Sequence, residues 1–358
     1  MYEKPTVDIE TIRQFCPEFR FHPNEKSFPC SIEYLLNDSV LYDREKPEFS
    51  IVNPTQRDLY EHWKGKERNY VDINSSQNSG GDDQQLYYWV KSVGNHDVLE
   101  FEITYILLYA WQDGQVLDVD STRANTVVGA ESGGAIGWIL GPFGALLGAA
   151  VGSAAGAAGG ALTADFSAIV SNYGEHQGDL ERVTVRIRSS LNGYRASRVT
   201  YEQHGNLHSF DVNDVELVGK THPVAAVGLG QHPTYNPLAH GGPGEHHLVV
   251  EDIWAAHMVD VISDAGWRWK PWADGSPMIE VGIDGEEPVN DQIWAKFEGR
   301  FGVPASPSLK SATYIDGTNL SGADWSTLTI LCKQGELAQA IPSENGPNGL
   351  NGRSFRTE

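Results

Sequence analysis

The sequence predicts a mainly β protein: a β-sandwich-like domain that carries an inserted glycine-zipper helical hairpin. Three observations predict this class. Several short segments alternate apolar and polar residues, as half-buried strands do. Turn-forming residues separate these segments. One long run, residues 129–162, consists almost entirely of glycine, alanine and larger apolar residues.

Four segments carry the strand prediction. Residues 99–111 begin with alternation and then become apolar throughout, as expected for a strand that enters a buried sheet. Residues 182–190 alternate Val and Ile with Thr and Arg, and residues 197–205 and 222–230 give two further strands. Turns are predicted at residues 191–193, 204–206 and 236–237. Short helices are expected at residues 31–36, 55–63 and 290–296.

The chain shows no composition shift or linker that would divide it into separate domains before residue 310. A single domain is predicted over residues 1–310, with the hairpin inserted at residues 125–165. Residues 311–358 form a C-terminal extension. Its end is rich in turn-forming residues, so we expect it to be mobile.

Glycines in the apolar run recur every four residues, in two ladders. The first ladder comprises Gly129, Gly133, Gly137 and Gly141, and the second comprises Gly144, Gly148, Gly152, Gly156 and Gly160. The phase slips at Pro142-Phe143, as it would at a turn between two helices. Such faces let membrane helices pack closely, whereas each glycine costs about 0.8–1 kcal/mol relative to alanine inside a helix. Membrane insertion or tight burial must offset that cost.

The length of the run limits the membrane interpretation. Residues 144–162 would span about 28 Å as a helix, close to a bilayer core of about 30 Å. Residues 129–140 would span only about 18 Å and include Glu131. A re-entrant or insertable hairpin therefore fits better than two permanent spans. A buried hairpin, or a glycine-rich loop packed within a soluble fold, stays an equal alternative.

The composition of the chain limits the classes of partner and the cellular compartment that we expect. The 358 residues include 26 Lys and Arg against 48 Asp and Glu, which gives a net charge of −22 and disfavours nucleic acid and strongly anionic membranes. The three cysteines are scattered and predict no disulfide framework. The first residues lack a basic segment followed by an apolar one, so we expect no secretory signal. The expectation is a protein that is cytoplasmic as synthesised and membrane-associated on activation.

A second motif follows the apolar run: His176, Asp179 and Glu181 have the spacing H-x-x-D-x-E. On an extended segment the two carboxylates point to one side, and a preceding turn can bring the imidazole over them. One imidazole and two carboxylates suit Mg²⁺, Mn²⁺ or Ca²⁺. Asp113 or Asp118 could supply a further oxygen. The alternative is a polar network that holds a loop.

Several segments together resemble the vacuolar protein sorting-associated protein 62 family. They include FRFHPNEKSFPCSIEYLL, YGEHQGDLERVTVRI, RVTYEQHG, HPVAAVGLGQHPTYNP and WAKFEGRFG, and they cover roughly residues 19–307. In the G-x-H-x-G-D-x-E block this chain has Leu180 where the family usually has Trp. The resemblance implies a fold more than an activity.

The pair YILLYAWQDG and GEHQGDLE is also similar to motifs of the necrosis- and ethylene-inducing peptide-like cytolysins. In those proteins the H-x-x-D-x-E spacing binds a divalent ion needed for membrane damage. The resemblance implies His176, Asp179 and Glu181 as ligands here, with Asp113 as the upstream partner. Residues 177, 178 and 180 depart from the cytolysin pattern, and the apolar run is inserted between the two motifs.

The leading functional prediction is a membrane-active, pore-forming or cytolysin-like protein with no catalytic residues. It would act on membrane lipid or glycolipid and form homo-oligomers there through its glycine faces. A soluble module that binds glycans or lipid headgroups is the first alternative; Trp267, Trp269 and Trp272, with His204 and His232 at strand ends, would line its site. A metal-dependent hydrolase is the second, although no nucleophile elbow or HExxH motif occurs.

Overall fold

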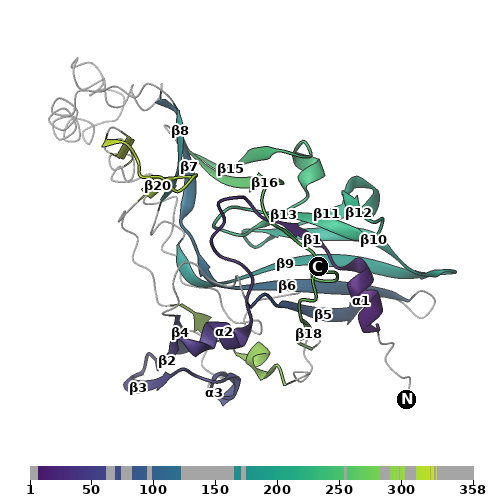
Figure 1. Cartoon of the computed structure of the whole chain (residues 1–358). Coiled ribbons are helices and arrows are strands. Elements are labelled where there is room, and N and C mark those ends of the chain that lie inside the picture. The colour runs from purple at the N-terminus through teal and green to yellow at the C-terminus, as the bar shows by residue number, and fades with distance from the viewer. Residues whose placement is uncertain are drawn as a thin grey trace.

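The computed structural model describes residues 7–61, 69–73, 83–94, 99–121, 165–170, 175–253, 256–282, 291–297, 299–302, 312–322, 324–325 and 328. Over these residues the chain is mainly β, with four sheets and a few short helices (Figure 1). The predicted mainly β class is confirmed. Apart from Asp165, the hairpin predicted at residues 125–165 lies outside the described residues, as does the tail from residue 329.

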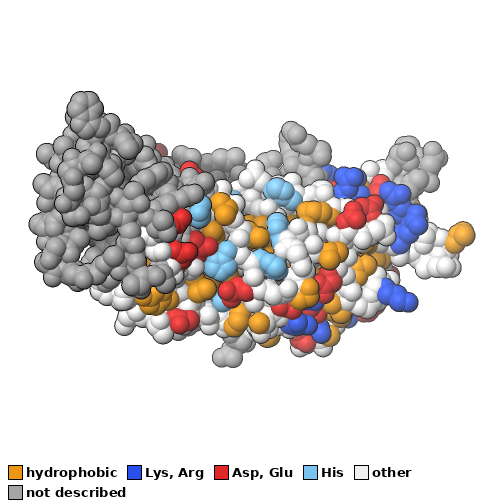
Figure 2. Space-filling model, turned by 90° about the horizontal axis from the view of Figure 1, so that it is seen from above, with side chains coloured by type: hydrophobic (Ala, Val, Ile, Leu, Met, Phe, Trp, Pro, Cys, Tyr) orange, Lys and Arg blue, Asp and Glu red, His pale blue; other side chains and the backbone are white. Residues whose placement is uncertain are grey.

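A six-stranded sheet is the centre of the fold. Its order is β11 (Asn206–Asp211), β10 (Gly193–Gln203), β9 (His176–Ser190), β6 (Glu100–Gln112), β5 (Leu86–Ser92) and β18 (Met278–Glu280). Only β18 pairs in parallel, with β5. The turns predicted at residues 191–193 and 204–206 join β9 to β10 and β10 to β11. Figure 2 shows Lys and Arg side chains gathered at the end of the molecule where β9 and β10 meet.

Three smaller sheets surround the central one. The first contains β12 (Leu217–Val218), β13 (His222–Val227), β1 (Glu18–Arg20) and β17 (Arg268–Trp269), and β14 (Thr234–Tyr235) also pairs with β13. The second runs β15 (Glu245–Ile253), β16 (Ala256–Ser263), β7 (Gln115–Val119), β8 (Phe166–Val170), β20 (Ala312–Tyr314). The third runs β19 (Arg300–Phe301), β4 (Asn69–Ile73), β2 (Ser39–Asp43), β3 (Lys46–Val52).

The central sheet is buried on both faces, which explains why β6 is apolar throughout. One face meets α1 (Ile9–Phe15) and the sheet of β1, β13 and β17, in a sandwich-like packing. The other face meets α2 (Ile32–Asn37) and the sheet of β2 and β4. Alternate residues of β6 therefore enter two different cores: Phe101, Ile103, Tyr105, Leu107 and Tyr109 in the first, and Ile106, Leu108 and Ala110 in the second.

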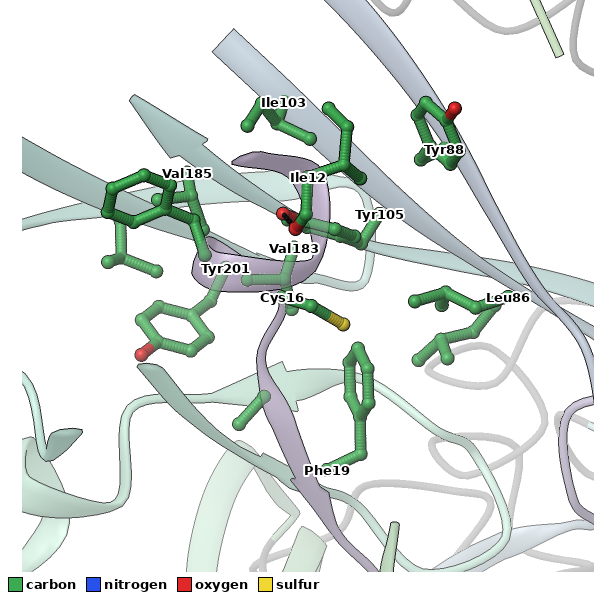
Figure 3. Close-up of a cluster of buried hydrophobic side chains, with 14 of the residues drawn as sticks. Ile12, Cys16, Phe19, Leu86, Tyr88, Ile103, Tyr105, Val183, Val185 and Tyr201 are labelled. Carbon is green, nitrogen blue, oxygen red and sulfur yellow. Dashed lines mark hydrogen bonds between the residues drawn. The ribbon is translucent and has the colours of Figure 1, made fainter. Parts of the chain in front are cut away.

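Figure 3 shows the first core where α1 crosses it, with Ile12 and Cys16 packed beside Tyr105 and Val183. The Tyr105 hydroxyl donates a 2.7 Å hydrogen bond to the carbonyl of Ile12, so the helix is fixed to β6 by a polar contact as well as by packing. The sequence did not predict α1. Its signal is Asp8, which accepts a hydrogen bond from the Thr11 amide at 2.7 Å and caps the helix.

The helix predictions hold for three segments. Ser31 caps α2 by accepting a 2.9 Å bond from the Tyr34 amide. The helix predicted at residues 55–63 is α3 (Gln56–Glu61), and the one at 290–296 is the 3₁₀ helix η3 (Ile293–Lys296). Two further 3₁₀ helices are η1 (Val212–Asp214) and η2 (Pro237–His240). The turn predicted at residues 236–237 is the start of η2, which Asn236 caps.

The predicted strands are all present, but their bounds differ by several residues. β10 begins at Gly193 rather than at residue 197, β13 ends at Val227 rather than at residue 230, and β9 begins at His176 rather than at residue 182. Its early start includes Gly178 at φ +68°, whose added Cβ would lie 2.5 Å from Cβ of Phe301. None of the helices within the described ranges is both long and apolar enough to cross a bilayer.

Candidate functional site

A buried cluster of ionisable side chains lies at one end of the central sheet, built around Tyr109 and His232. Tyr109 of β6 is paired with Asp179 of β9, so their side chains share a face of the sheet. His232 comes from the loop after β13, and its ring lies flat on Tyr109 with centroids 3.8 Å apart. Its Nδ1 is 3.1 Å from Oδ2 of Asp179, and its Nε2 is 3.5 Å from Oε1 of Glu25.

The backbone of the loop at Gly230 holds two further acidic residues, Glu25 and Asp113, in place. Glu25 follows β1, and its Oε2 accepts a 2.8 Å hydrogen bond from the Gly230 amide. Asp113 lies between β6 and β7, and its own amide donates to the Gly230 carbonyl at 2.8 Å. Gly230 has φ +74°, and a Cβ there would lie 2.9 Å from Cβ of Asp113. His232 also has positive φ, at 62°. This strained loop therefore brings the imidazole between carboxylates from two distant segments.

Burial makes the charges of this cluster interact strongly. His232 is fully buried, and Asp179, Glu25 and Glu181 are almost so. Desolvation alone would lower the pKa of His232, but the carboxylates of Glu25 and Asp179 outweigh it and raise the pKa to about 9. His232 is therefore an imidazolium at neutral pH, the internal counterion of the two carboxylates.

The other acidic groups respond to the same arrangement. Desolvation would raise the pKa of Glu25, but His232 and backbone amides outweigh it, and the pKa is lowered. Desolvation and the charge of Glu25 raise the pKa of Asp113 to about 6. Burial raises the pKa of Tyr109, and the nearby carboxylates of Glu25, Asp179 and Glu181 raise it further. Four carboxylates thus lie around one buried imidazole, and the charge of Lys26 also acts on Asp113.

Three of the four predicted metal ligands gather here: Asp179, Glu181 and Asp113 surround Tyr109 and His232. The fourth, His176, opens β9 opposite Gln112, and its Nδ1 makes a 2.7 Å bond with the Gly178 carbonyl oxygen. Asp118, the other candidate oxygen ligand, instead faces His247 at 2.7 Å and Ser167 at 2.5 Å. Sequence analysis missed Glu25, because its loop carries no local signal of the pairing.

The donor set suits a hard divalent cation in chemistry, since it is rich in carboxylate oxygens. The arrangement is not that of a formed metal site, because the His232 ring lies between Asp179 and Glu25. Accordingly, no three His, Cys, Asp or Glu side chains within the described ranges are placed to share one ion.

His204 does not belong to this cluster. It lies in the turn between β10 and β11 at φ +51°, and its Nε2 is 2.6 Å from Oδ2 of Asp260 on β16. The Tyr235 hydroxyl donates to the same oxygen. Each of the two predicted histidines, His204 and His232, therefore has its own buried aspartate, in a different part of the fold.

The tryptophans predicted to line a ligand platform pack against the first core. Trp269 is fully buried and contacts Trp267, whose ring stacks on Phe21 at 5.2 Å. Trp272 is half-buried and stacks on His222 with centroids 3.8 Å apart. Trp269 has no exposed face to offer a ligand.

The glycine ladders lie outside the described residues, but the two chain segments that lead into and out of them are described. They are the adjacent antiparallel strands β7 and β8, with Val119 opposite Phe166. Beyond that pair, both the amide and the hydroxyl of Ser121 donate to Oδ1 of Asp165, at 2.8 and 2.7 Å. The inserted segment therefore leaves and re-enters the fold at one closed point.

No protein-family model matches the chain, so its resemblance to the vacuolar protein sorting-associated protein 62 family gains no support. No curated protein matches it either. Among solved structures, necrosis and ethylene inducing protein 2 from the causal agent of witches' broom disease of cocoa is similar at a TM-score of 0.31 and 10% sequence identity. The match covers 78% of this chain and 77% of that one.

Proposed function

We propose that the chain is a membrane-active, cytolysin-like protein whose glycine-rich insertion enters a lipid bilayer. The observation that carries the proposal is the closed base of the insertion. Because Ser121 bonds to Asp165 next to the paired strands β7 and β8, the segment between them can change its surroundings without altering its points of attachment. An apolar segment attached in this way suits deployment from a folded carrier.

The mechanism uses the two glycine ladders. In lipid, contact between apolar side chains is no more favourable than their contact with the acyl chains. Helices therefore associate through close backbone packing on small residues. Ladders such as Gly144, Gly148 and Gly152 provide that surface. The hairpins of several copies would then assemble on membrane lipid or glycolipid, and a chain synthesised in the cytoplasm would become membrane-associated on activation.

The test replaces residues 122–164 by a polar turn of about 2–5 residues, the usual hairpin length. The contact between Ser121 and Asp165 makes such a closure compatible with the fold. The full chain should release dye from liposomes, whereas the shortened chain should not, at an unchanged melting temperature. A second variant with a Gly/Ser linker of the original length controls for chain length. Equal dye release by all three proteins would refute the proposal.

The buried carboxylates favour a second candidate, a module that binds a glycan or lipid headgroup with the help of Mg²⁺, Mn²⁺ or Ca²⁺. Its support is the set of carboxylate oxygens around His232, a donor type that suits such an ion. For an ion to bind, the His232 ring would have to leave its place between Asp179 and Glu25; these two carboxylates, with Asp113 and Glu181, would then hold the ion. A glycan array probed with and without EDTA tests it: binding that EDTA abolishes is expected, and no binding in either condition would rule it out.

A further inference from the structure

The hairpin of β9 and β10 places arginines directly opposite one another in two neighbouring rungs. Arg188 pairs with Arg195, and Arg186 pairs with Arg198. A β-bulge at Ser197 keeps the two β10 arginines on the same face of the hairpin. Like charges directly opposite in a sheet destabilise it, so this arrangement opposes folding stability. It is conspicuous in a chain with a net charge of −22.

Two of these four arginines form ion pairs within the described part of the chain. On β6, Glu102 accepts a 3.0 Å hydrogen bond from Nε of Arg186, and Glu100 pairs with Arg188 at 3.2 Å. Arg195 and Arg198 are exposed, and neither forms an ion pair with another described residue. Asp211 lies opposite Arg198 on β11 without forming an ion pair with it, and its Oδ1 accepts hydrogen bonds from the amide and side chain of Asn213.

Apolar side chains project beside this basic face. Leu191, in the turn between β9 and β10, is fully exposed. Leu99 is 45% exposed, and its carbonyl accepts a 2.8 Å bond from the Ser189 amide, which places it next to the same turn. Figure 2 shows the surrounding Lys and Arg side chains at this end of the molecule. We call Leu99, Leu191, Arg195 and Arg198 the hairpin tip.

We propose that the hairpin tip docks on the surface of an anionic phospholipid bilayer. The two arginines without an ion pair, Arg195 and Arg198, would bind headgroup phosphates, and the leucines would enter the boundary with the acyl chains. The net charge of −22 does not prevent this docking. At physiological ionic strength the Debye length is about 8 Å, so acidic groups far from the membrane are largely screened from it. The charges of the hairpin tip therefore dominate the interaction with the lipid headgroups.

This docking surface goes beyond the proposed insertion and does not depend on it. In Figure 1 the tip of β9 and β10 lies at the opposite end of the molecule from β7 and β8, where the insertion is attached. Docking is measured as co-flotation of the full chain with vesicles, and insertion as dye release. A protein that floats without causing release would refute insertion and leave docking intact.

The experiment compares vesicles of phosphatidylcholine alone with vesicles that also contain phosphatidylserine. The wild type should bind the anionic vesicles more tightly. The double variant Arg195→Gln/Arg198→Gln should lose about 30-fold in partition coefficient, from about 1 kcal/mol for each arginine near the surface. Leu191→Ser should lose about tenfold or more, since a buried leucine contributes about 1.5–3 kcal/mol.

The matched control, Arg57→Gln/Arg268→Gln, removes the same charge from exposed sites on α3 and β17 and should bind like the wild type. All variants change exposed residues, so melting temperatures should stay near that of the wild type. Equal binding of the tip variants and the control would overturn the proposal. So would inorganic phosphate that binds the tip as strongly as the vesicles do, because the site would then be one for a soluble anion.

Discussion

Tyr109 lies flat on His232, with ring centroids 3.8 Å apart and an interplanar angle of 1°. Because the contact uses the faces of both rings, the ring nitrogens of His232 stay free to point in the ring plane at Asp179 and Glu25. The electron-rich face of a tyrosine also attracts a cation, so the stack favours the protonated imidazole. Tyr109 thereby joins the apolar core of the sheet to the buried charges at its end.

Truncating Tyr109 tests this role. Tyr109→Ala should destabilise the fold by about 3–5 kcal/mol, as loss of a buried aromatic side chain does. Tyr109→Phe keeps the ring and removes a buried hydroxyl that has no hydrogen-bond partner among the described residues. It should therefore be neutral or slightly stabilising. Urea denaturation measures both, and a large loss in Tyr109→Phe would show that the hydroxyl has a partner.

Metal binding predicts a response to EDTA. An ion that binds only the folded state at a hundredfold excess over its Kd stabilises it by about 2.7 kcal/mol, so EDTA should lower the melting temperature of the wild type. Asp179→Asn and Glu181→Gln should remove this response, whereas Asp118→Asn, on the separate His247 network, should keep it. If elemental analysis finds no divalent ion in the purified wild type, the cluster is only a polar network.

Stability should depend on pH through His247, which lies between Asp118 and Glu245. The hydrogen bond to Asp118 raises the pKa of His247, with Glu245 adding to the effect. Its contribution is full below about pH 6.5, the usual histidine pKa, and is lost as pH rises through the raised folded value. His247→Gln should therefore be less sensitive to pH than the wild type between about pH 6 and 8.

His222 provides a control of opposite sign. Burial lowers the pKa of its imidazole, so its contribution is present above about pH 6.5 and is lost as the pH falls. His222→Gln should reduce acid sensitivity instead. Unfolding in urea at a series of pH values compares the two variants, and parallel pH profiles for His247→Gln and the wild type would contradict the assignment.

Gly178 at the start of β9 should be intolerant of a side chain. Alanine there would adopt a left-handed backbone, at about 1–2 kcal/mol, and would overlap Phe301, at about 1–3 kcal/mol more. Gly178→Ala should lose about 2–5 kcal/mol. Gly275→Ala has a similar φ of +74° but no neighbour within 4 Å, so it should show the backbone cost alone. Equal losses for the two variants would mean that Phe301 moves aside.

The glycine ladders predict a local effect on membrane activity. Gly148→Leu or Gly152→Leu would hold the helices apart at the packing face and abolish dye release from liposomes. Ala149→Leu, between these positions, should keep most of the activity. If both glycine variants release dye and melt like the wild type, the ladders do not pack helix on helix.

The sequence by itself determined the local elements of this protein. The alternation in residues 182–190, the turn at residues 191–193 and the helix at residues 31–36 each depend on a few neighbouring residues, where backbone sterics and short hydrogen bonds set the outcome. These predictions hold in β9, in the β9–β10 turn and in α2.

Only the tertiary structure decided which distant segments meet. Glu25, Asp113, Asp179 and His232 come together because sheet register and the strained loop at Gly230 bring four parts of the chain to one end of β6. The spacing of His176, Asp179 and Glu181 predicted one motif, yet the His176 ring turns to a backbone carbonyl while His232 takes the central position. Long-range packing leaves no periodic signal in the sequence, and for that reason local rules could not place the loop residues that complete the site.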